Sequence, residues 1–242
     1  MKDSVRFLIT CEYRTRAMLI RGVARRILNA GRNSQLAYAQ PSLAALVSDI
    51  VELKLNMPPK IETSEPITKK NLIMLFLRTR IHETLGKEAK SKGLSATKLV
   101  GDIILDADFK QLDLQYADGL ENEVMVPNSF NLPSECRLKI NKEIAKRMIS
   151  MPTALGKAEF ENVGKIMNEI LASHFKIALP TPAPVKAVVD NEQIKFTVFM
   201  NSELHKALKE YCERQSDVTG EFISVNATIV KWIEEAAEDE LW

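Results

Sequence analysis

The sequence has few of the residues from which compact catalytic or metal sites are built. Its three cysteines, Cys11, Cys136 and Cys212, lie far apart without CxxC spacing, which argues against a disulfide framework and a zinc knuckle. The nine glycines are scattered, and no glycine-rich phosphate loop, GxSxG elbow or HExxH motif occurs. We therefore expect a protein that is not an enzyme and that needs no metal or cofactor.

Histidine is also scarce. The three histidines, His82, His174 and His205, fall on predicted helices without a carboxylate or cysteine partner at ligand spacing. We expect each of them to be a surface or boundary residue.

Long apolar runs are missing as well. No segment approaches the roughly 20 consecutive apolar residues that a membrane span requires. Polar residues after Met1 return too soon for a secretion signal. We therefore expect a cytoplasmic protein without a membrane partner. Apolar residues still make up 45% of the 242 positions, which is enough to bury real cores.

A strong excess of charge of one sign is absent, since the net charge is +1, which argues against a phosphate-binding surface. The average hides a gradient: residues 1–56 contain nine Lys or Arg and four Asp or Glu, and residues 191–242 contain five and eleven. The two quarters face different partners or each other, or their charges simply lie on solvated helix faces.

Five arginines of the first predicted helix form a basic patch. Such a patch fits a solvated face and a surface for phosphate or an acidic partner equally well. The acidic end of the chain is either a solvated helix end or a segment that docks on these arginines. The basic patch consists of Arg14, Arg16, Arg21, Arg25 and Arg26.

Prolines divide the chain. They cluster between residues 58 and 66, at Pro127 and Pro133, and between residues 180 and 184, and these clusters are typical of linkers. Four pieces of similar size remain, so an internal repeat is expected. The pieces are residues 1–57, 68–108, 127–178 and 191–242.

The fourth piece has the clearest pattern. Apolar residues recur at every second position from Ile194 to Met200, which predicts a half-buried strand. From Ser202 the apolar spacing becomes that of a helix, which either Asn201 or Ser202 would cap. After a polar loop through Ser216 and Gly220, a second amphipathic helix begins near Ser224. The predicted unit is a strand followed by two helices.

The second piece repeats this order. Ile73, Leu75 and Leu77 alternate on one face of a predicted strand, a helix follows that Gly93 ends, and Ser95 opens another helix. The first helix begins with the same pattern as in the fourth piece, Ile-His or Leu-His followed by Leu three residues later. The two pieces therefore look like copies of one unit.

The other two pieces fit with more variation. The first has a predicted strand that contains Val5, Phe7 and Ile9, a helix over residues 12–29, and a helix that opens at Pro41-Ser42. The third has a short strand over residues 129–132 and a helix over 135–148. A last helix over about 160–174 follows an interruption by Pro152 and Gly156.

Pieces two and four resemble the ribbon-helix-helix family of Arc- and MetJ-type DNA-binding repressors. The resemblance lies in residues 195–200 (KFTVFM), residues 203–205 (ELH) and residues 224–226 (SVN), and residues 129–132 (SFNL) look like an Arc-type ribbon. Tandem units in one chain are similar in kind to the TraY family of relaxosome proteins. The resemblance extends over most of the chain outside the linkers.

The resemblance implies a mainly α fold with short antiparallel β-ribbons, built from about four ribbon-helix-helix units that pair within the chain. A lone strand with two short helices has unpaired edges and too little core, so it requires a second copy. Linkage in one chain raises the effective concentration of that copy. The sequence leaves open which units pair, and whether the protein is a monomer with internal pseudo-dimers or a homo-oligomer.

In the family the ribbon lies in the major groove, and the start of the second helix presents backbone amides to phosphate. The resemblance therefore implies double-stranded DNA as the partner, with Arg6 suited to guanine and Asn131 to adenine. The implied base-reading residues are Arg6, Ser129, Asn131, Lys195, Thr197 and Phe199. The implied phosphate-contacting residues are Ser42, Ser95, Thr97, Ser224 and Asn226.

Three departures from the family pattern keep alternatives open. The outward positions of the second ribbon are Leu72, Met74 and Phe76, which suit another protein surface better than a base edge. Glu159 and Glu161 stand near an expected phosphate contact, and Phe199 replaces a polar reader.

We therefore expect a DNA-binding regulator, either a transcriptional repressor or a plasmid or phage accessory factor. The alternatives are a protein-binding regulator or inhibitor that has lost DNA binding, and a protein that coats nucleic acid regardless of sequence.

Overall fold

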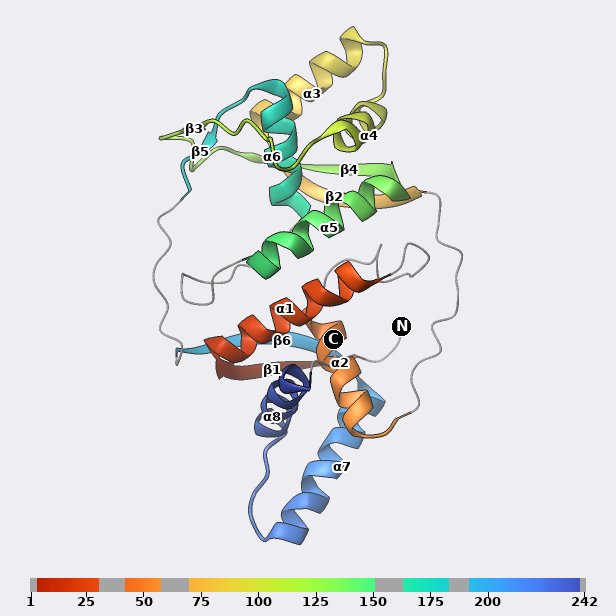
Figure 1. The fold of residues 1–242 in the computed structure, drawn as a ribbon, viewed down its shortest axis with the longest axis vertical. Helices are drawn as coiled ribbons and strands as arrows, with labels where there is room; N and C mark the ends of the chain where they lie inside the picture. Colours follow the sequence, from red (N-terminus) through yellow and green to blue (C-terminus); the bar gives the residue numbers. More distant parts are fainter. Residues whose placement is uncertain (1–3, 31–41, 58–69, 151–162, 183–191, 240–242) are drawn as a thin grey trace.

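The computed structural model describes residues 4–30, 42–57, 70–150, 163–182 and 192–239 (Figure 1). Four times in these ranges the chain runs from a nine-residue strand through two helices. Glu159, Glu161, the interruption at Pro152 and Gly156, and the prolines between residues 58 and 66 lie outside the described residues. The successive units are β1 (Ser4–Glu12), α1 (Tyr13–Asn29) and α2 (Leu43–Lys54); β2 (Lys70–Arg78), α3 (Thr79–Ser91) and α4 (Ala96–Asp106); β4 (Met125–Pro133), α5 (Ser134–Ser150) and α6 (Val163–Phe175); and β6 (Gln193–Asn201), α7 (Ser202–Thr219) and α8 (Val225–Glu238).

The strands pair in a nested order. β1 pairs antiparallel with β6, and β2 pairs antiparallel with β4, each as a two-stranded ribbon. The first and last units therefore form one half of the protein, called the terminal half below, and the two middle units form the central half (Figure 1). The protein is mainly helical with short antiparallel strand pairs, as predicted.

The second helices exchange places within each half. In the terminal half α2 lies against β6 and α8 lies against β1, so each second helix packs on the strand of the paired unit. In the central half α4 lies against β4 and α6 against β2 in the same way. Neither unit of a pair can complete its core without the other.

The alternation predicted for the strands separates buried from exposed side chains. Ile9, Ile73 and Leu77 are buried under the helices, as are Val198 and Met200. The residues between them face outward. Both ribbons therefore have one face in the core and one face free for contacts.

Serine caps mark the starts of three second helices where the sequence predicts them. The hydroxyl oxygens of Ser42, Ser95 and Ser224 each accept a hydrogen bond from the backbone N–H three residues later, at 3.1–3.2 Å. At the start of α7 it is Asn201 that caps, since its side chain accepts from Glu203 N at 2.8 Å. The predicted polar loop after α7 is shorter than expected, because the helix continues through Ser216 to Thr219.

Two proline predictions are wrong. Pro127 and Pro133 lie in strand β4 and not in a linker. They stand opposite Phe76 and Lys70. Both prolines occupy outward positions, and they are an even number of positions apart, so their backbone groups point to the same side of the strand. In an antiparallel pair, alternate residues direct their backbone groups away from the partner strand, so a proline there removes no ladder hydrogen bond.

A small parallel pairing was not predicted. Residues 116–117 (β3, Tyr116–Ala117) pair with residues 179–180 (β5, Leu179–Pro180). This contact ties the connection between α4 and β4 to the segment that follows α6.

The two halves meet through α1 and α5, which lie side by side at the middle of the molecule (Figure 1). Both helices bury neighbouring positions, such as Leu19 and Ile20 in α1 and Ile144 and Ala145 in α5. By contrast, α3 buries a single stripe at Ile81, Leu85 and Ala89. A helix that buries adjacent positions has two covered faces, here one toward its own half and one toward the other half.

The acidic end of the chain docks on the basic first unit. Thr15 Oγ1 donates a hydrogen bond to Glu234 Oε1 at 2.7 Å, and Lys54 Nζ lies 2.5 Å from Glu235 Oε2. Of the three predicted readings of the charge gradient, these contacts favour the one in which the two quarters face each other. Lys54 and Thr15 are the contacting groups here.

The buried thiols give a test of this packing. Cys11, Cys136 and Cys212 are free and buried, and burial raises the pKa of Cys11 and of Cys136 to about 11. Because the thiolate is the reactive form, we expect a chromogenic disulfide reagent to modify the folded protein far more slowly than the denatured protein at mildly alkaline pH. Three thiols should react in concentrated guanidinium chloride. Fast modification of all three in the native protein would contradict the described core.

Candidate functional site

The outward face of the β1–β6 ribbon brings together residues from opposite ends of the chain. Arg6 lies opposite Phe199, and Thr10 lies opposite Lys195. Arg6 and Lys195 are exposed, and Phe199 exposes 61% of its surface. Thr197, half-buried, lies on the same face. Four of the six predicted base-reading residues therefore share one surface, which we call the terminal ribbon face.

The terminal ribbon face mixes cations with neutral side chains. The guanidinium group of Arg6 can donate two parallel hydrogen bonds to one partner, and the hydroxyl group of Thr197 can both donate and accept. Two apolar side chains are also exposed on this face: Phe199, and Leu8, which lies opposite Thr197 and is 50% exposed. Glu12 is exposed at one end of the ribbon and sets a negative boundary to the face.

Asn226 completes the open edge of β1. The backbone N–H of Thr10 donates to Asn226 Oδ1 at 2.8 Å, and Asn226 Nδ2 donates to the Thr10 carbonyl at 2.8 Å. The amide therefore occupies the position that a further strand would take. The sequence assigned Asn226 to a phosphate contact, whereas its side chain is engaged with the backbone of the ribbon.

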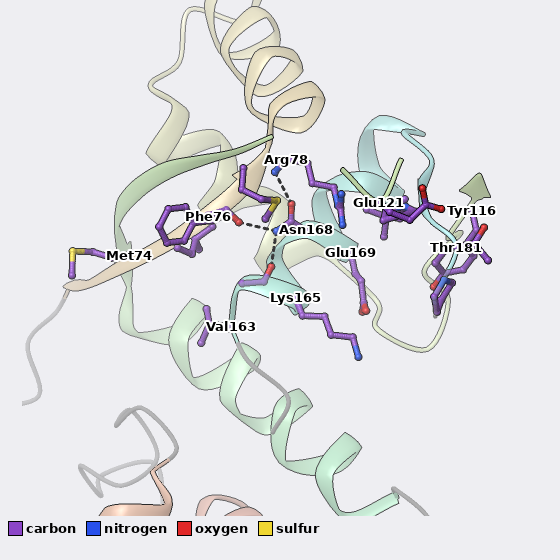
Figure 2. Close-up of a pocket in the computed structure, with 16 residues that line it drawn as sticks. Met74, Phe76, Arg78, Tyr116, Glu121, Val163, Lys165, Asn168, Glu169 and Thr181 are labelled. Carbon is purple, nitrogen blue, oxygen red and sulfur yellow. Dashed lines mark hydrogen bonds between the residues drawn. The ribbon is translucent and has the colours of Figure 1, made fainter. Parts of the chain in front are cut away.

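Asn168 performs the same task in the central half, as the dashed lines of Figure 2 show. Its Oδ1 accepts from Arg78 N at 3.0 Å, and its Nδ2 donates to the Phe76 carbonyl at 2.9 Å. Asn168 is buried although it is polar. Sequence reasoning missed it. Its one sequence signal is that an asparagine stands at an inward position of a helix. Comparison of the repeats does not reveal it, because Asn168 and Asn226 stand at different distances from the starts of their helices.

Two second helices pack on the terminal ribbon, and the first turn of one of them is bonded to its edge. Asn226 holds the first turn of α8 on β1, and α2, which begins after Ser42, lies against β6. The caps at Ser42 and Ser224 each satisfy one backbone N–H of the first turn. The other first-turn N–H groups and the positive end of the helix dipole favour an anion at these positions.

The predicted basic patch is divided by the structure. Arg26 forms an ion pair with Asp49, so its charge is compensated within the first unit. Arg14 and Arg25 are exposed, and Arg21 lies on the same side of α1 by helical spacing. Arg16 is half-buried on another side. The arginines therefore do not form one continuous surface.

The outward face of the β2–β4 ribbon has a different character. Leu72, Met74 and Phe76 expose 66%, 78% and 58% of their surfaces, as expected from their outward positions, and Met125 exposes 40%. From Leu72 to Phe76, and across β4 from Pro127 to Asn131, the described side chains include no charged group. We call this surface the central ribbon face.

Two predicted base-reading residues lie on this apolar face. Asn131 stands opposite Leu72, and Ser129 stands opposite Met74; both are exposed. The predicted phosphate contacts Ser95 and Thr97 lie at the start of α4, which packs on β4. The structure thus separates these four residues from the cations Arg6 and Lys195.

A cavity of about 780 Å³ adjoins the central ribbon (Figure 2). Its walls come from β2, from the first turns of α6 and from the β3–β5 pairing. Beside it, Arg78 Nη1 lies 3.6 Å from Glu123 Oε2, so the cation at the end of β2 has a carboxylate partner. Lining residues include Met74, Phe76, Tyr116, Lys165, Glu169 and Leu179.

Neither a metal site nor a membrane span is present in the part of the chain that the structure describes. No group of three or more His, Cys, Asp or Glu residues is placed to hold a metal there. None of the described helices is long and apolar enough to cross a membrane. No protein-family model, curated protein or solved structure matches the chain.

The asparagine at the ribbon edge predicts a stability effect. Replacing Asn226 with alanine leaves the Thr10 N–H and carbonyl without their partners, so we expect the free energy of unfolding to fall by about 1–3 kcal/mol. Urea unfolding followed by circular dichroism measures the change. Asn29→Ala, at an exposed position on α1, is the matched control and should stay within about 0.5 kcal/mol of the parent. Equal effects of the two substitutions would show that the amide does not hold the edge.

Proposed function

We propose that this protein is a DNA-binding regulator of the ribbon-helix-helix type that inserts the β1–β6 ribbon in the major groove. The observation that carries the proposal is the joint placement of Arg6, Lys195 and Thr197 on one exposed ribbon face. A two-stranded ribbon has the width that the major groove accepts. A repressor and an accessory factor of a plasmid or phage are both regulators of this kind.

In this proposal the terminal ribbon face supplies the base contacts. Arg6 donates hydrogen bonds to the O6 and N7 atoms of one guanine, and Lys195 donates to a second guanine. Thr197 forms a hydrogen bond with either base of a neighbouring base pair. Leu8 and Phe199 contact thymine methyl groups. The first turns of α2 and α8 bind the phosphates on the two sides of the groove through their backbone N–H groups.

The central ribbon face does not enter the major groove in this arrangement. Ser129 and Asn131 carry donors and acceptors, but they stand opposite Met74 and Leu72. Placing those apolar side chains against base edges would desolvate the bases without replacing their hydrogen bonds. Base reading is therefore assigned to one ribbon of the two.

The charge of the chain sets an expectation for affinity. The first and last quarters together hold about as many acidic as basic side chains, so long-range attraction to DNA is weak. Affinity must then come from a few short-range contacts, and its dependence on salt should be shallow compared with that of a strongly basic protein.

Selection from a random duplex library tests the proposal. The full chain should enrich a defined sequence, and Arg6→Ala or Lys195→Ala should each weaken binding to that duplex by about 10- to 100-fold, the worth of one good base contact. Fluorescence anisotropy at fixed salt measures the change. Ser129→Ala, an exposed outward residue of the central ribbon face, is the control and should leave the affinity unchanged.

Other results would assign base reading to another surface or favour another function. A loss with Ser129→Ala but not with Lys195→Ala would move base reading to the central ribbon. Equal affinity for every duplex would favour a protein that coats DNA regardless of sequence. No binding to any duplex at low salt would favour the alternative function, a protein-binding regulator. The near-neutral charge and the exposed central ribbon face support that alternative.

A further inference from the structure

The apolar side chains of the central ribbon face form a continuous patch. Leu72, Met74 and Phe76 are consecutive outward residues of β2, and Met125 starts the paired strand near the end of this row. On the terminal ribbon face, by contrast, Leu8 and Phe199 stand next to Arg6 and near Lys195. The two ribbons have the same backbone pairing, so the difference lies in the side chains that they present.

The area of this patch comes close to what a stable interface needs. Taking about 200 Å² for each fully exposed large side chain, the four apolar residues expose on the order of 500 Å². Two such patches in contact would bury roughly 1,000 Å² before the flanking residues are counted, which approaches the lower limit of stable protein interfaces at about 1,200 Å². Pro127, Ser129 and Asn131 lie on the same face and add to it.

The charge of the patch favours a second copy of the chain as its occupant. Residues 72–76 and the residues opposite them, 127–131, include no charged side chain, so the centre of the face can meet a second copy without like-charge repulsion and without the cost of burying a charge. The nearby Arg78 is paired with Glu123. DNA is disfavoured at the same surface, because an uncharged face offers phosphates no partner.

We propose that two copies of the protein pack their central ribbon faces against each other to form a symmetric dimer. Two-stranded ribbons stack face to face, and a two-fold axis beside Met74 sets Leu72 of each copy against Phe76 of the other. The interface uses one patch twice and needs no second complementary surface. Both terminal ribbon faces remain uncovered. If the proposed function holds, on which this last step rests, the dimer offers two ribbons to two half-sites of DNA.

Sedimentation velocity across the micromolar range tests the dimer without DNA. The parent chain should sediment at twice its 27.3 kDa mass. Met74→Glu buries a charge at the axis and should raise the dimer dissociation constant by about 100-fold or more. Phe199→Glu, which introduces the same charge at an exposed apolar position of the other ribbon, is the matched control and should stay dimeric. Thermal unfolding verifies that both variants are folded.

The outcomes separate the dimer from the proposed function. A parent chain that stays monomeric throughout the range overturns the dimer, and so does dissociation by Phe199→Glu but not by Met74→Glu. Dissociation by Met74→Glu alone supports it, whatever the DNA selection finds. If no duplex is enriched while the dimer behaves as expected, the proposed function fails and the dimer stands. If Met74→Glu stays dimeric, Leu72→Glu gives the second measurement, and a dimer that survives both substitutions rules out this face.

Discussion

The exchange of second helices between paired units is the interaction on which the structure depends. A strand with two helices cannot cover both its strand edge and its helix faces, so an isolated unit would leave apolar surface and backbone groups in water. Here α8 covers β1 and α2 covers β6, while α6 and α4 do the same in the central half. Asn226 and Asn168 then bond to the backbone groups that remain at the outer edges of β1 and β2. Each ribbon thus requires one strand and one covering helix from each of two units.

Nested pairing within one chain lets the two ribbons differ. In a homodimer of single units both strands of a ribbon carry the same side chains, whereas here Arg6 faces Phe199 and Met74 faces Ser129. Cations gather on one ribbon and apolar side chains on the other, although both have the same antiparallel backbone. The proposed function and the proposed dimer assign an anionic partner to the first ribbon and an apolar one to the second. The packing of α1 on α5 joins the two halves.

Near-neutral overall charge is compatible with this division. The acidic end of the chain is partly compensated inside the terminal half, where Glu235 lies against Lys54 and Glu234 accepts from Thr15. Arg6 and Lys195 point outward on the ribbon face instead, so local placement decides what the surface attracts. A count of charged residues along the sequence averages over these two situations and therefore says little about either.

Local features of the sequence determined much of the fold. Two-residue spacing identified the strands, and serine caps identified the starts of α2, α4 and α8, because these signals act within a few residues. The tertiary structure alone decided which strands pair, since Arg6 and Phe199 are distant in the chain. It also decided that Asn226 and Asn168 bond to ribbon edges and that Pro127 and Pro133 belong to a strand. The physical reason is common to all three: whether a backbone group needs a partner depends on which neighbour the fold brings to it, and that neighbour comes from another unit.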